Sequence, residues 1–429
     1  MQSLTRRNAL QMLWVASASR ERLQAQRSPS SLDLVRFGII GVGARGSGLM
    51  RNLLEIPQVT VTALADLEKS RVMNGMDTVA SARKTKPAYY CNGPRDYQNL
   101  LGRGDVDAVL IATGNEDHAH MAVDSMRAGK HVLSEVPAAT TVAECWELVR
   151  AAETNNVRYM LAENYTYFRS NKIVLNMVSQ GMFGETNYAE CGYTHDTRSL
   201  QFNADGSANW RSQRAQLPGD RYPLHAIGTV SQWLGINRGD RFVYLESMAS
   251  PAKALNYSLA KRFGADSPQA KTKFASDTVV TLLKTAQGKL VELRNSLYAP
   301  KPEPGLSYHN LIGTKATYKD EDNDPKIWLE GRSAEYHWEP LTKYQKEFDH
   351  PLWKRWAADA LKTGHRGGDF VQLMDFVSCL REGRPSPIDV YDGATWSAII
   401  ELSAKSVTHN SGLQEFPDFT NGKWENRKG

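Results

Sequence analysis

The sequence predicts an α/β fold in two domains: a parallel sheet with crossover helices, then an α+β domain with an open, mostly antiparallel sheet. Short apolar stretches alternate with helical ones over residues 33–165, which is the pattern of parallel strands joined by helices. Over residues 166–429 the apolar stretches become longer and alternate with polar residues, as in antiparallel sheets with one covered face. The length of 429 residues also exceeds what one hydrophobic core usually supports.

Residues 1–32 are set apart from this fold. They contain Thr5-Arg6-Arg7-Asn8, a short apolar run from Met12 to Val15 and the small residues Ala16-Ser17-Ala18, which is typical of a twin-arginine export signal. The alternative is a disordered basic tail, because Gln11 interrupts the apolar region. We therefore expect a periplasmic or secreted protein, and a cytoplasmic one if the signal does not function.

Charge and composition exclude several classes of partner. The formal net charge is +5, and residues 1–27 alone hold five arginines and one glutamate, so the rest is nearly neutral. The sequence has no basic stripe interleaved with aromatic residues, so it does not predict nucleic-acid binding. No apolar run has the roughly 18 residues that a membrane span needs. The four cysteines are far apart and no histidine pair has metal-site spacing, so we predict free thiols and no metal.

The first strand, Val35 to Ile40, runs into a G-x-G-x-x-G motif. Gly41 permits a tight turn, Gly43 lets backbone N–H groups approach a pyrophosphate, and Gly46 lets the next helix pack closely on the sheet. That helix, expected from Gly46 to about Ile56, would direct its N-terminus at the phosphates. An ordinary glycine-rich turn is the alternative for the motif alone. Placed between a predicted strand and a predicted helix, the motif predicts a Rossmann dinucleotide-binding domain.

The second strand, Val59 to Ala65, ends at Asp66. Asp66 follows the glycine motif by about 20 residues, the distance at which an acidic residue binds the ribose hydroxyls of a dinucleotide. Its carboxylate would repel the additional phosphate of NADP, which favours NAD as the cofactor. The alternative role of Asp66 is a helix cap.

Three later strands deliver polar residues to the same edge of the sheet. The third, Ala108 to Ala112, is followed by a loop to His118 and a helix through Met126. The strand from His131 ends at Glu135, and after a helix over 142–152 the strand 159–162 ends at Glu163-Asn164. Because ligands bind at the carboxyl ends of parallel strands, we expect these residues at the cofactor.

The second domain is predicted from its alternating stretches and two closing helices. A proline-rich loop at 300–305 and an acidic turn at 320–324 interrupt the sheet. The expected strands cover 186–193, 242–247, 278–283 and 289–297, and the helices cover 369–382 and 393–408.

Three clusters in this domain carry groups that bind sugars or move protons. They are 193–198 (YTHDTR), then Trp210-Arg211 with 222–225 (YPLH), and 364–369 (GHRGGD). Sugar hydroxyls need polar groups beside aromatic faces, and proton transfer near neutral pH needs histidine or an activated tyrosine. The alternatives are structural: a capping pair at His195 and Asp196, a core aromatic at Tyr222 and a helix-start turn around His365.

In combination, the motifs of the first domain resemble the Gfo/Idh/MocA family of dinucleotide-dependent enzymes. They are the glycine motif, the Thr113-x-x-x-x-His118 spacing, 129–132 (GKHV), Glu135-x-Pro137 and Glu163-Asn164. Sugar dehydrogenases of that family carry a lysine between the glutamate and the proline, and an aspartate four residues before the active-site histidine. This chain has Val136 and Arg221 there. Since valine moves no proton, the usual relay for alcohol oxidation is impaired.

The second-domain motifs are similar to glycoside hydrolase family 109, a branch of NAD-dependent glycosidases that includes α-N-acetylgalactosaminidases. They comprise the three clusters above and 236–240 (INRGD). The resemblance implies hydrolysis through a transient redox step. NAD takes hydride from the sugar C3, the C2 proton leaves, the glycosidic oxygen is eliminated, water adds, and the hydride returns. Such a route needs no pair of carboxylates flanking the bond.

The resemblance also assigns roles residue by residue. Tyr222, His225 and His365 are expected to be catalytic, with His365 transferring a proton at the leaving group. Tyr193, Arg211, Tyr222 and His225 are expected to bind the sugar, and Tyr308 is a candidate substitute for a tyrosine that the family carries after a Pro-Arg-Pro run. The residues expected to bind NAD are Gly41, Gly43, Arg45, Gly46, Asp66, Asn115, His118, Glu135, Val136 and Asn164.

Two other functions stay open at this point. The dinucleotide fold also suits an ordinary sugar or polyol oxidoreductase, against which Val136 and Arg221 argue. The altered loop, with Arg366 and Gly368 where the family more often has glycine and methionine, also suits a sugar or nucleotide sensor. An exposed sheet face further predicts a homo-oligomer.

Overall fold

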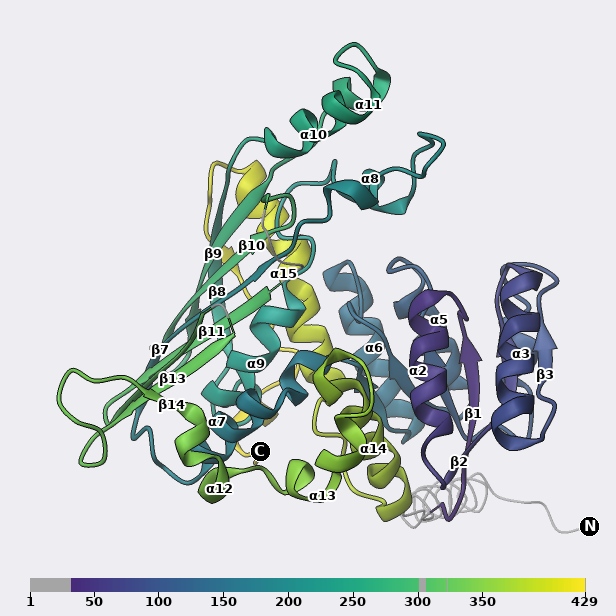
Figure 1. Cartoon of the computed structure of the whole chain (residues 1–429), viewed down its shortest axis with the longest axis horizontal. Coiled ribbons are helices and arrows are strands. Elements are labelled where there is room, and N and C mark those ends of the chain that lie inside the picture. Colours follow the sequence, from purple (N-terminus) through teal and green to yellow (C-terminus); the bar gives the residue numbers. More distant parts are fainter. Residues whose placement is uncertain (1–31, 301–305, 322, 429) are drawn as a thin grey trace, which may run out of the picture.

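A computed structural model describes residues 32–300, 306–321 and 323–428 (Figure 1). The predicted export signal in residues 1–32 lies outside the described residues except for Leu32, and so does most of the proline-rich loop, residues 301–305. No helix in the described part of the chain is both long and apolar enough to cross a membrane.

The first domain is built on a six-stranded sheet whose pairs are all parallel. Its strand order, β3-β2-β1-β4-β5-β6, is that of the Rossmann fold, with the switch in direction between β1 and β4. The strands are β1 (Val35–Ile40), β2 (Val59–Ala65), β3 (Ala88–Tyr90), β4 (Ala108–Ile111), β5 (His131–Ser134) and β6 (Tyr159–Leu161), and the helices are α2 (Ala44–Leu54), α3 (Lys69–Arg83), α4 (Tyr97–Leu101), α5 (His118–Arg127) and α6 (Val142–Asn155).

The second domain is an open sheet of nine strands. Within the described residues, only β10 and β7 pair in parallel among its neighbouring strands, so the sheet is mostly antiparallel. The order β14-β13-β12-β11-β7-β10-β9-β8-β15 joins β7 (Thr186–Thr194), β8 (Phe242–Ala249), β9 (Thr278–Thr285), β10 (Leu290–Ser296), β11 (Leu306–Gly313), β12 (Ala316–Glu321), β13 (Asp324–Leu329), β14 (Glu339–Pro340) and β15 (Gln414–Glu415).

Helices cover the side of this sheet that faces the first domain (Figure 1). α9 packs directly on β7 and β11, and α15 packs on β8. α8, α10 and α11 extend beyond one end of the sheet. The helices of this domain are α7 (Arg169–Ser179), α8 (Trp210–Arg214), α9 (Leu224–Leu234), α10 (Ala254–Phe263), α11 (Pro268–Lys271), α12 (Gln345–Phe348), α13 (Pro351–Ala360), α14 (Gly368–Glu382) and α15 (Val390–Thr408).

The two closing helices complete the first domain rather than standing apart from it. The ring of Phe376 in α14 lies 6.3 Å from that of Phe37 in β1. The carboxylate of Glu401 in α15 accepts the Val142 N–H at 2.6 Å, at the start of α6. That start is also capped locally, since Thr141 and Glu144 form a capping box. Residues far apart in the chain thus share one core.

Candidate functional site

The predicted cofactor residues meet where the direction of strand order switches, between β1 and β4. The glycine loop follows β1, and Gly41 there has a φ of +89°, which favours glycine. A Cβ on Gly46 would lie 1.9 Å from the Gly41 carbonyl oxygen, whereas one on Gly43 would meet nothing closer than the Arg71 guanidinium at 3.9 Å. Gly46 is therefore required by packing, and Gly43 leaves space for a ligand.

Asp66 lies beside this loop at the end of β2. One carboxylate oxygen accepts the Val42 N–H at 2.8 Å and the other accepts the Glu68 N–H at 2.9 Å. The two bonds fix the carboxylate next to the glycine turn. Its position fits the predicted contact with a ribose.

Three buried side chains at this edge keep polar atoms without a partner among the described residues. They are Asn115 Nδ2, His118 Nε2 and Asn164 Oδ1. The other ring nitrogen of His118 bonds to the Pro137 carbonyl at 2.8 Å, and burial lowers the pKa of His118, so the imidazole is neutral. Buried polar atoms are rarely left unpaired, so these three fit a bound dinucleotide.

Arg45 joins the two domains at the same place. Its guanidinium bonds to Glu135 at 2.6 Å and, through two nitrogens, to Asp369 of α14 at 2.7 and 2.9 Å. Burial opposes its charge, but the two carboxylates outweigh burial and raise the pKa of Arg45. Asp369 also accepts from Asn164 at 2.9 Å and pairs with His365 at 2.9 Å. One carboxylate from the second domain thus orients three predicted site residues.

Glu163, His225 and Tyr222 form a hydrogen-bonded series. The Glu163 carboxylate is fully buried and accepts from His225 Nδ1 at 2.8 Å, and His225 Nε2 lies 3.3 Å from the Tyr222 hydroxyl. Because Nδ1 keeps its proton and donates it in the hydrogen bond to Glu163, Nε2 is the accepting nitrogen of the neutral imidazole. Burial raises the pKa of Tyr222, so the phenol keeps its proton and donates. As in other enzymes, an acid orients a histidine that is in turn hydrogen-bonded to a hydroxyl group.

Aromatic rings hold this series in place. The Tyr165 ring stacks on His225 with centroids 4.2 Å apart, and burial raises the pKa of Tyr165 to about 12. Tyr193 packs edge-on against His225 and its hydroxyl lies 2.9 Å from His195 Nδ1. The predicted sugar residues Tyr193, Tyr222 and His225 therefore lie together.

A cavity of ≈ 180 Å³ opens beside these residues. Arg211 lines it and stacks on the Trp210 ring at 4.2 Å, as expected for a sugar contact beside an aromatic face. The other lining residues are Asn115, Tyr193, His195, Thr197, Leu200, Gln201, Arg214, Arg221, Tyr222, Leu297 and Tyr298. Nothing in the described part of the chain gathers three or more His, Cys, Asp or Glu side chains around a potential metal site.

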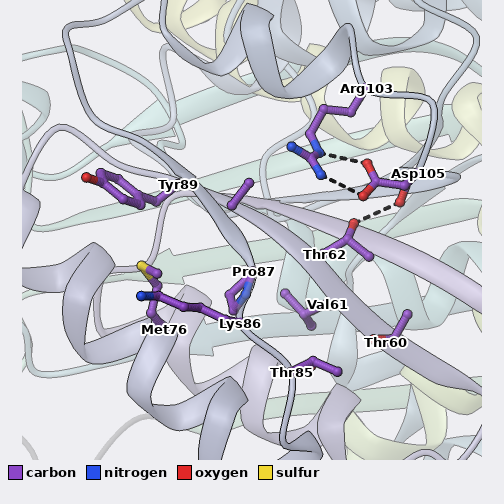
Figure 2. Close-up of a pocket in the computed structure, with 11 residues that line it drawn as sticks. Thr60, Val61, Thr62, Met76, Thr85, Lys86, Pro87, Tyr89, Arg103 and Asp105 are labelled. Atoms are coloured by element: carbon purple, nitrogen blue, oxygen red, sulfur yellow. Dashed lines mark hydrogen bonds and ion pairs between the residues drawn. The ribbon is translucent and has the colours of Figure 1, made fainter.

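A second cavity lies at the other end of the first sheet (Figure 2). It is lined by Thr60 and Thr62 from the beginning of β2, away from the carboxyl ends of the strands. Its arginine, Arg103, pairs with Asp105 through two bonds of 2.7 and 2.6 Å. This cavity is therefore not part of the dinucleotide edge, which lies at the carboxyl ends of the strands.

Tyr308 does not join the candidate site. In β11 it stands opposite Gly192 of β7, whereas Ser307 stands opposite Tyr193. Side chains alternate between the faces of a sheet, so Tyr308 lies on the face away from Tyr193, where Arg294 stacks on its ring at 4.9 Å. The prediction of Tyr308 as a sugar contact is not supported by this register.

Val136 and Arg221 occupy the two positions where sugar dehydrogenases carry their relay. Val136 is buried beside Glu135, whose side chain accepts the Val136 N–H at 3.1 Å. Arg221 donates to the carbonyls of Leu217 at 2.8 Å and Ser276 at 3.1 Å. Neither residue therefore replaces the lysine or the aspartate that moves a proton in that relay.

The sequence placed Glu163 at the cofactor edge and Asp369 in the 364–369 cluster, but it did not indicate the bond of Glu163 to His225, the stacking of Tyr165 or the contacts of Asp369. An acid directly at the end of a strand on the ligand edge was the signal for Glu163. The contacts of Asp369 join distant segments, which no local pattern indicates.

The fold and site define a two-domain Rossmann enzyme of the Gfo/Idh/MocA type. The family model for the oxidoreductase family, NAD-binding Rossmann fold, matches residues 35–163. The model for the glycosyl hydrolase 109 C-terminal domain matches residues 167–426. The chain belongs to glycoside hydrolase family 109.

Curated relatives agree with this assignment over all or most of the chain. A glycosyl hydrolase family 109 protein of Solibacter usitatus is 37% identical over 442 residues and covers 100% of both chains. An alpha-N-acetylgalactosaminidase of Shewanella oneidensis is 38% identical and covers 92% of this chain and 87% of its own.

Solved structures share the fold at low identity. Levoglucosan dehydrogenase in complex with NADH has a TM-score of 0.71 at 19% identity and covers 90% of this chain and 99% of its own. An oxidoreductase domain protein from Kribbella flavida has a TM-score of 0.67 at 18% identity, covering 90% and 100%. These likenesses establish the architecture.

Proposed function

We propose that this glycosidase is NAD-dependent and releases terminal α-linked N-acetylgalactosamine without net oxidation of the sugar. The observation that carries the proposal is the series Glu163–His225–Tyr222, which places a proton acceptor and a proton donor together beside a cavity. The name of the Shewanella oneidensis relative supports the choice of sugar.

The residues that would hold NAD are those of the glycine loop, Asp66 and the side chains with unpaired buried atoms, Asn115, His118 and Asn164. When bound there, NAD would supply a reversible hydride acceptor for the sugar C3. The pairing of Arg45 with Asp369 would hold the second domain against this edge.

The chain's own residues then account for the proton movements. His225 Nε2 accepts a proton from the sugar, and the buried Glu163 carboxylate stabilises the imidazolium that forms. Tyr222 keeps its proton because burial raises its pKa, so it donates a hydrogen bond to the sugar oxygen that gains negative charge. The hydrogen bond to Asp369 raises the pKa of His365, which suits it to protonate the departing glycosidic oxygen.

The composition of the cavity wall favours this route over ordinary glycosidase chemistry. Among the residues described around it there is no aspartate or glutamate. Glycosidases that use general acid catalysis with a second carboxylate need two such groups flanking the bond. Elimination after transient oxidation needs a base and a redox partner instead.

The test is a nitrophenyl α-N-acetylgalactosaminide assayed with simultaneous absorbance readings for nitrophenol and NADH. We expect nitrophenol release without accumulation of NADH, and exchange of the sugar C2 proton with deuterated solvent. Retention of the C2 proton through turnover would overturn the elimination route. NADH formation equal to substrate consumed would instead identify a sugar oxidoreductase.

A further inference from the structure

The cavity beside Tyr222 has an unbalanced charge. Three arginines line it, Arg211, Arg214 and Arg221, and its described wall contains no carboxylate. Arg211 stacks on Trp210, and neither an ion pair nor a side-chain hydrogen bond of Arg211 is found within the described residues. A neutral sugar does not require such a wall, because hydroxyls are satisfied by uncharged donors and acceptors.

Arg214 is the most informative of the three. It is only 7% exposed at the end of α8, and one of its nitrogens donates to the Arg221 carbonyl at 2.7 Å. The other, Nη1, is buried without a hydrogen-bond partner among the described residues. Glu116, the nearest carboxylate, is 3.8 Å away with a half-exposed side chain. A buried guanidinium with an unused donor is costly unless an acceptor arrives with the ligand.

Apart from the long ion pair with Glu116, the surrounding groups do little to neutralise Arg214. Asn115, which also belongs to the dinucleotide edge, lines the cavity with a neutral amide and brings no negative charge. Burial lowers the pKa of the nearby His195, so this imidazole adds neither charge nor a counter-ion. Asp220 is the buried carboxyl on this side; its Oδ1 accepts the Tyr222 N–H at 2.9 Å, and burial raises its pKa to about 7. At neutral pH Asp220 offsets only part of the positive charge.

Arg221 adds to the excess positive charge of the cavity wall because its partners are neutral. Its guanidinium donates to backbone carbonyls, including those of Leu217 and Ser276, and lies 5.5 Å from the centre of the Tyr298 ring. Carbonyl oxygens and an aromatic face do not cancel the charge, and Arg221 Nε is buried without a hydrogen-bond partner among the described residues. The cavity therefore combines open donors with a net positive wall.

We propose that the cavity binds a sugar that carries an anionic group, a sulfate ester or a carboxylate, and that Arg214 recognises this group. The inference rests on the proposed glycosidase function and narrows its substrate class from neutral to acidic glycosides. Arginine suits the role because its planar fork bonds to both oxygens of a carboxylate or sulfate.

Binding to the NAD-loaded enzyme tests this inference without turnover. Isothermal titration compares N-acetylgalactosamine with its 6-sulfate, and galactose with galacturonate, so that the two arms separate sulfate from carboxylate. We expect the acidic member of at least one pair to bind roughly tenfold more tightly, the usual effect of a charge-assisted hydrogen bond. Equal affinity within both pairs would overturn the inference.

Variants then locate the recognition. Arg214→Gln should abolish the preference for the acidic sugar while leaving the affinity for the neutral sugar unchanged, and Arg214→Lys should restore part of the preference. Arg355→Gln, at an arginine on α13 that stacks on Trp356, serves as the matched control. An Arg214→Gln variant that loses both sugars equally, or that loses NAD affinity instead, would contradict the assignment.

Turnover separates this inference from the proposed function. If neither the neutral nor the sulfated nitrophenyl glycoside releases nitrophenol, the proposed function fails, whereas a measured binding preference for the acidic sugar still stands. If the neutral glycoside is cleaved and the acidic sugars bind no better, the inference fails and the proposed function stands.

Discussion

At the scale of single residues, Glu163 determines which nitrogen of His225 can take a proton. Its carboxylate is fully buried and bonds to His225 Nδ1 at 2.8 Å and to the Tyr165 N–H at 3.0 Å. A buried acceptor of this kind both fixes the ring and stabilises its protonated form. The acid is therefore a positioning residue that acts through the histidine.

Glu163→Gln should lower kcat by about a hundredfold, because an amide stabilises the imidazolium poorly and no longer enforces the tautomer with Nε2 free. The glutamine keeps the size of the side chain, so NAD affinity should be retained. Steady-state kinetics with an NAD titration measures both, and Glu185→Gln, at an exposed acid, is the control. Unchanged kcat with a raised KM would show that Glu163 only shapes the sugar pocket.

The pH dependence of kcat/KM should report the protonation of His365, which is paired with Asp369. The hydrogen bond to Asp369 raises the pKa of His365, so the donor stays protonated to a higher pH than an ordinary histidine. We expect kcat/KM to be sustained below this raised pKa and to fall as the pH passes it.

Asp369→Asn should move that basic limb to lower pH, toward the ordinary histidine pKa of about 6.5. The profile is measured at saturating NAD because Asp369 also bonds to Arg45 and Asn164. Asp359→Asn, at an exposed acid paired with Lys362, is the control. A basic limb that stays in place would assign it to another group.

The sequence predicted the residues of the dinucleotide edge because their signals are local. Asn115, His118 and Asn164 each follow a strand of a parallel sheet, and such strand ends converge. Tyr308 could not be placed in this way. Which face a strand residue occupies depends on its register with the neighbouring strand, and the pairing of β11 with β7 is not visible in either strand alone.

At the scale of elements, the glycine loop gives two substitutions with opposite expectations. Gly46→Ala would place a methyl group 1.9 Å from the Gly41 carbonyl oxygen, so it should lower the Tm of the chain without NAD. Gly43→Ala has open space around it and should leave that Tm unchanged, yet weaken NAD binding because the methyl group occupies the path of the pyrophosphate. Thermal unfolding with and without NAD distinguishes the two, and equal behaviour would refute the assignment of separate roles.

The elements that the sequence predicted begin and end within a few residues of the observed ones, whereas others, such as α3, α9 and β11 to β13, were not predicted. β1 and β2 match the expected ranges, and the helix after the glycine motif begins at Ala44 rather than Gly46. The short strand β3 was missed because three residues carry no periodic pattern. The acidic turn predicted to interrupt the second sheet joins β12 to β13, since Glu321 pairs with Asp324 in an antiparallel hairpin.

At the scale of the whole molecule, α14 and α15 tie the two domains into one structure. Phe376 of α14 is fully buried against Phe37 of β1, although most of the second domain lies between the two residues in the chain. Sequence patterns predicted both helices, but not that they pack on the first sheet. The predictions of a homo-oligomer and of export are not decided by these contacts and stay predictions.

Phe376→Ala should destabilise the fold by about 3–5 kcal/mol, the usual cost of emptying a buried aromatic site. Because the lost contact is with β1, which leads into the glycine loop, NAD affinity should fall as well. Denaturant unfolding and an NAD titration measure the two effects. Phe274→Ala, in a separate small hydrophobic cluster, should lower stability while leaving NAD affinity intact; the same loss of NAD affinity in both variants would contradict the proposed coupling.

The return of α14 and α15 to the first sheet has a consequence for synthesis on the ribosome. The strands of the nucleotide-binding half emerge first, but Phe37 lacks its partner, and the Leu161 N–H lacks the Ile388 carbonyl, until nearly the whole second sheet has been translated. A nascent chain paused before residue 368 would expose an apolar face and could not form the Arg45–Asp369 pair. Chaperones that bind unfinished chains would therefore meet this protein at its first domain.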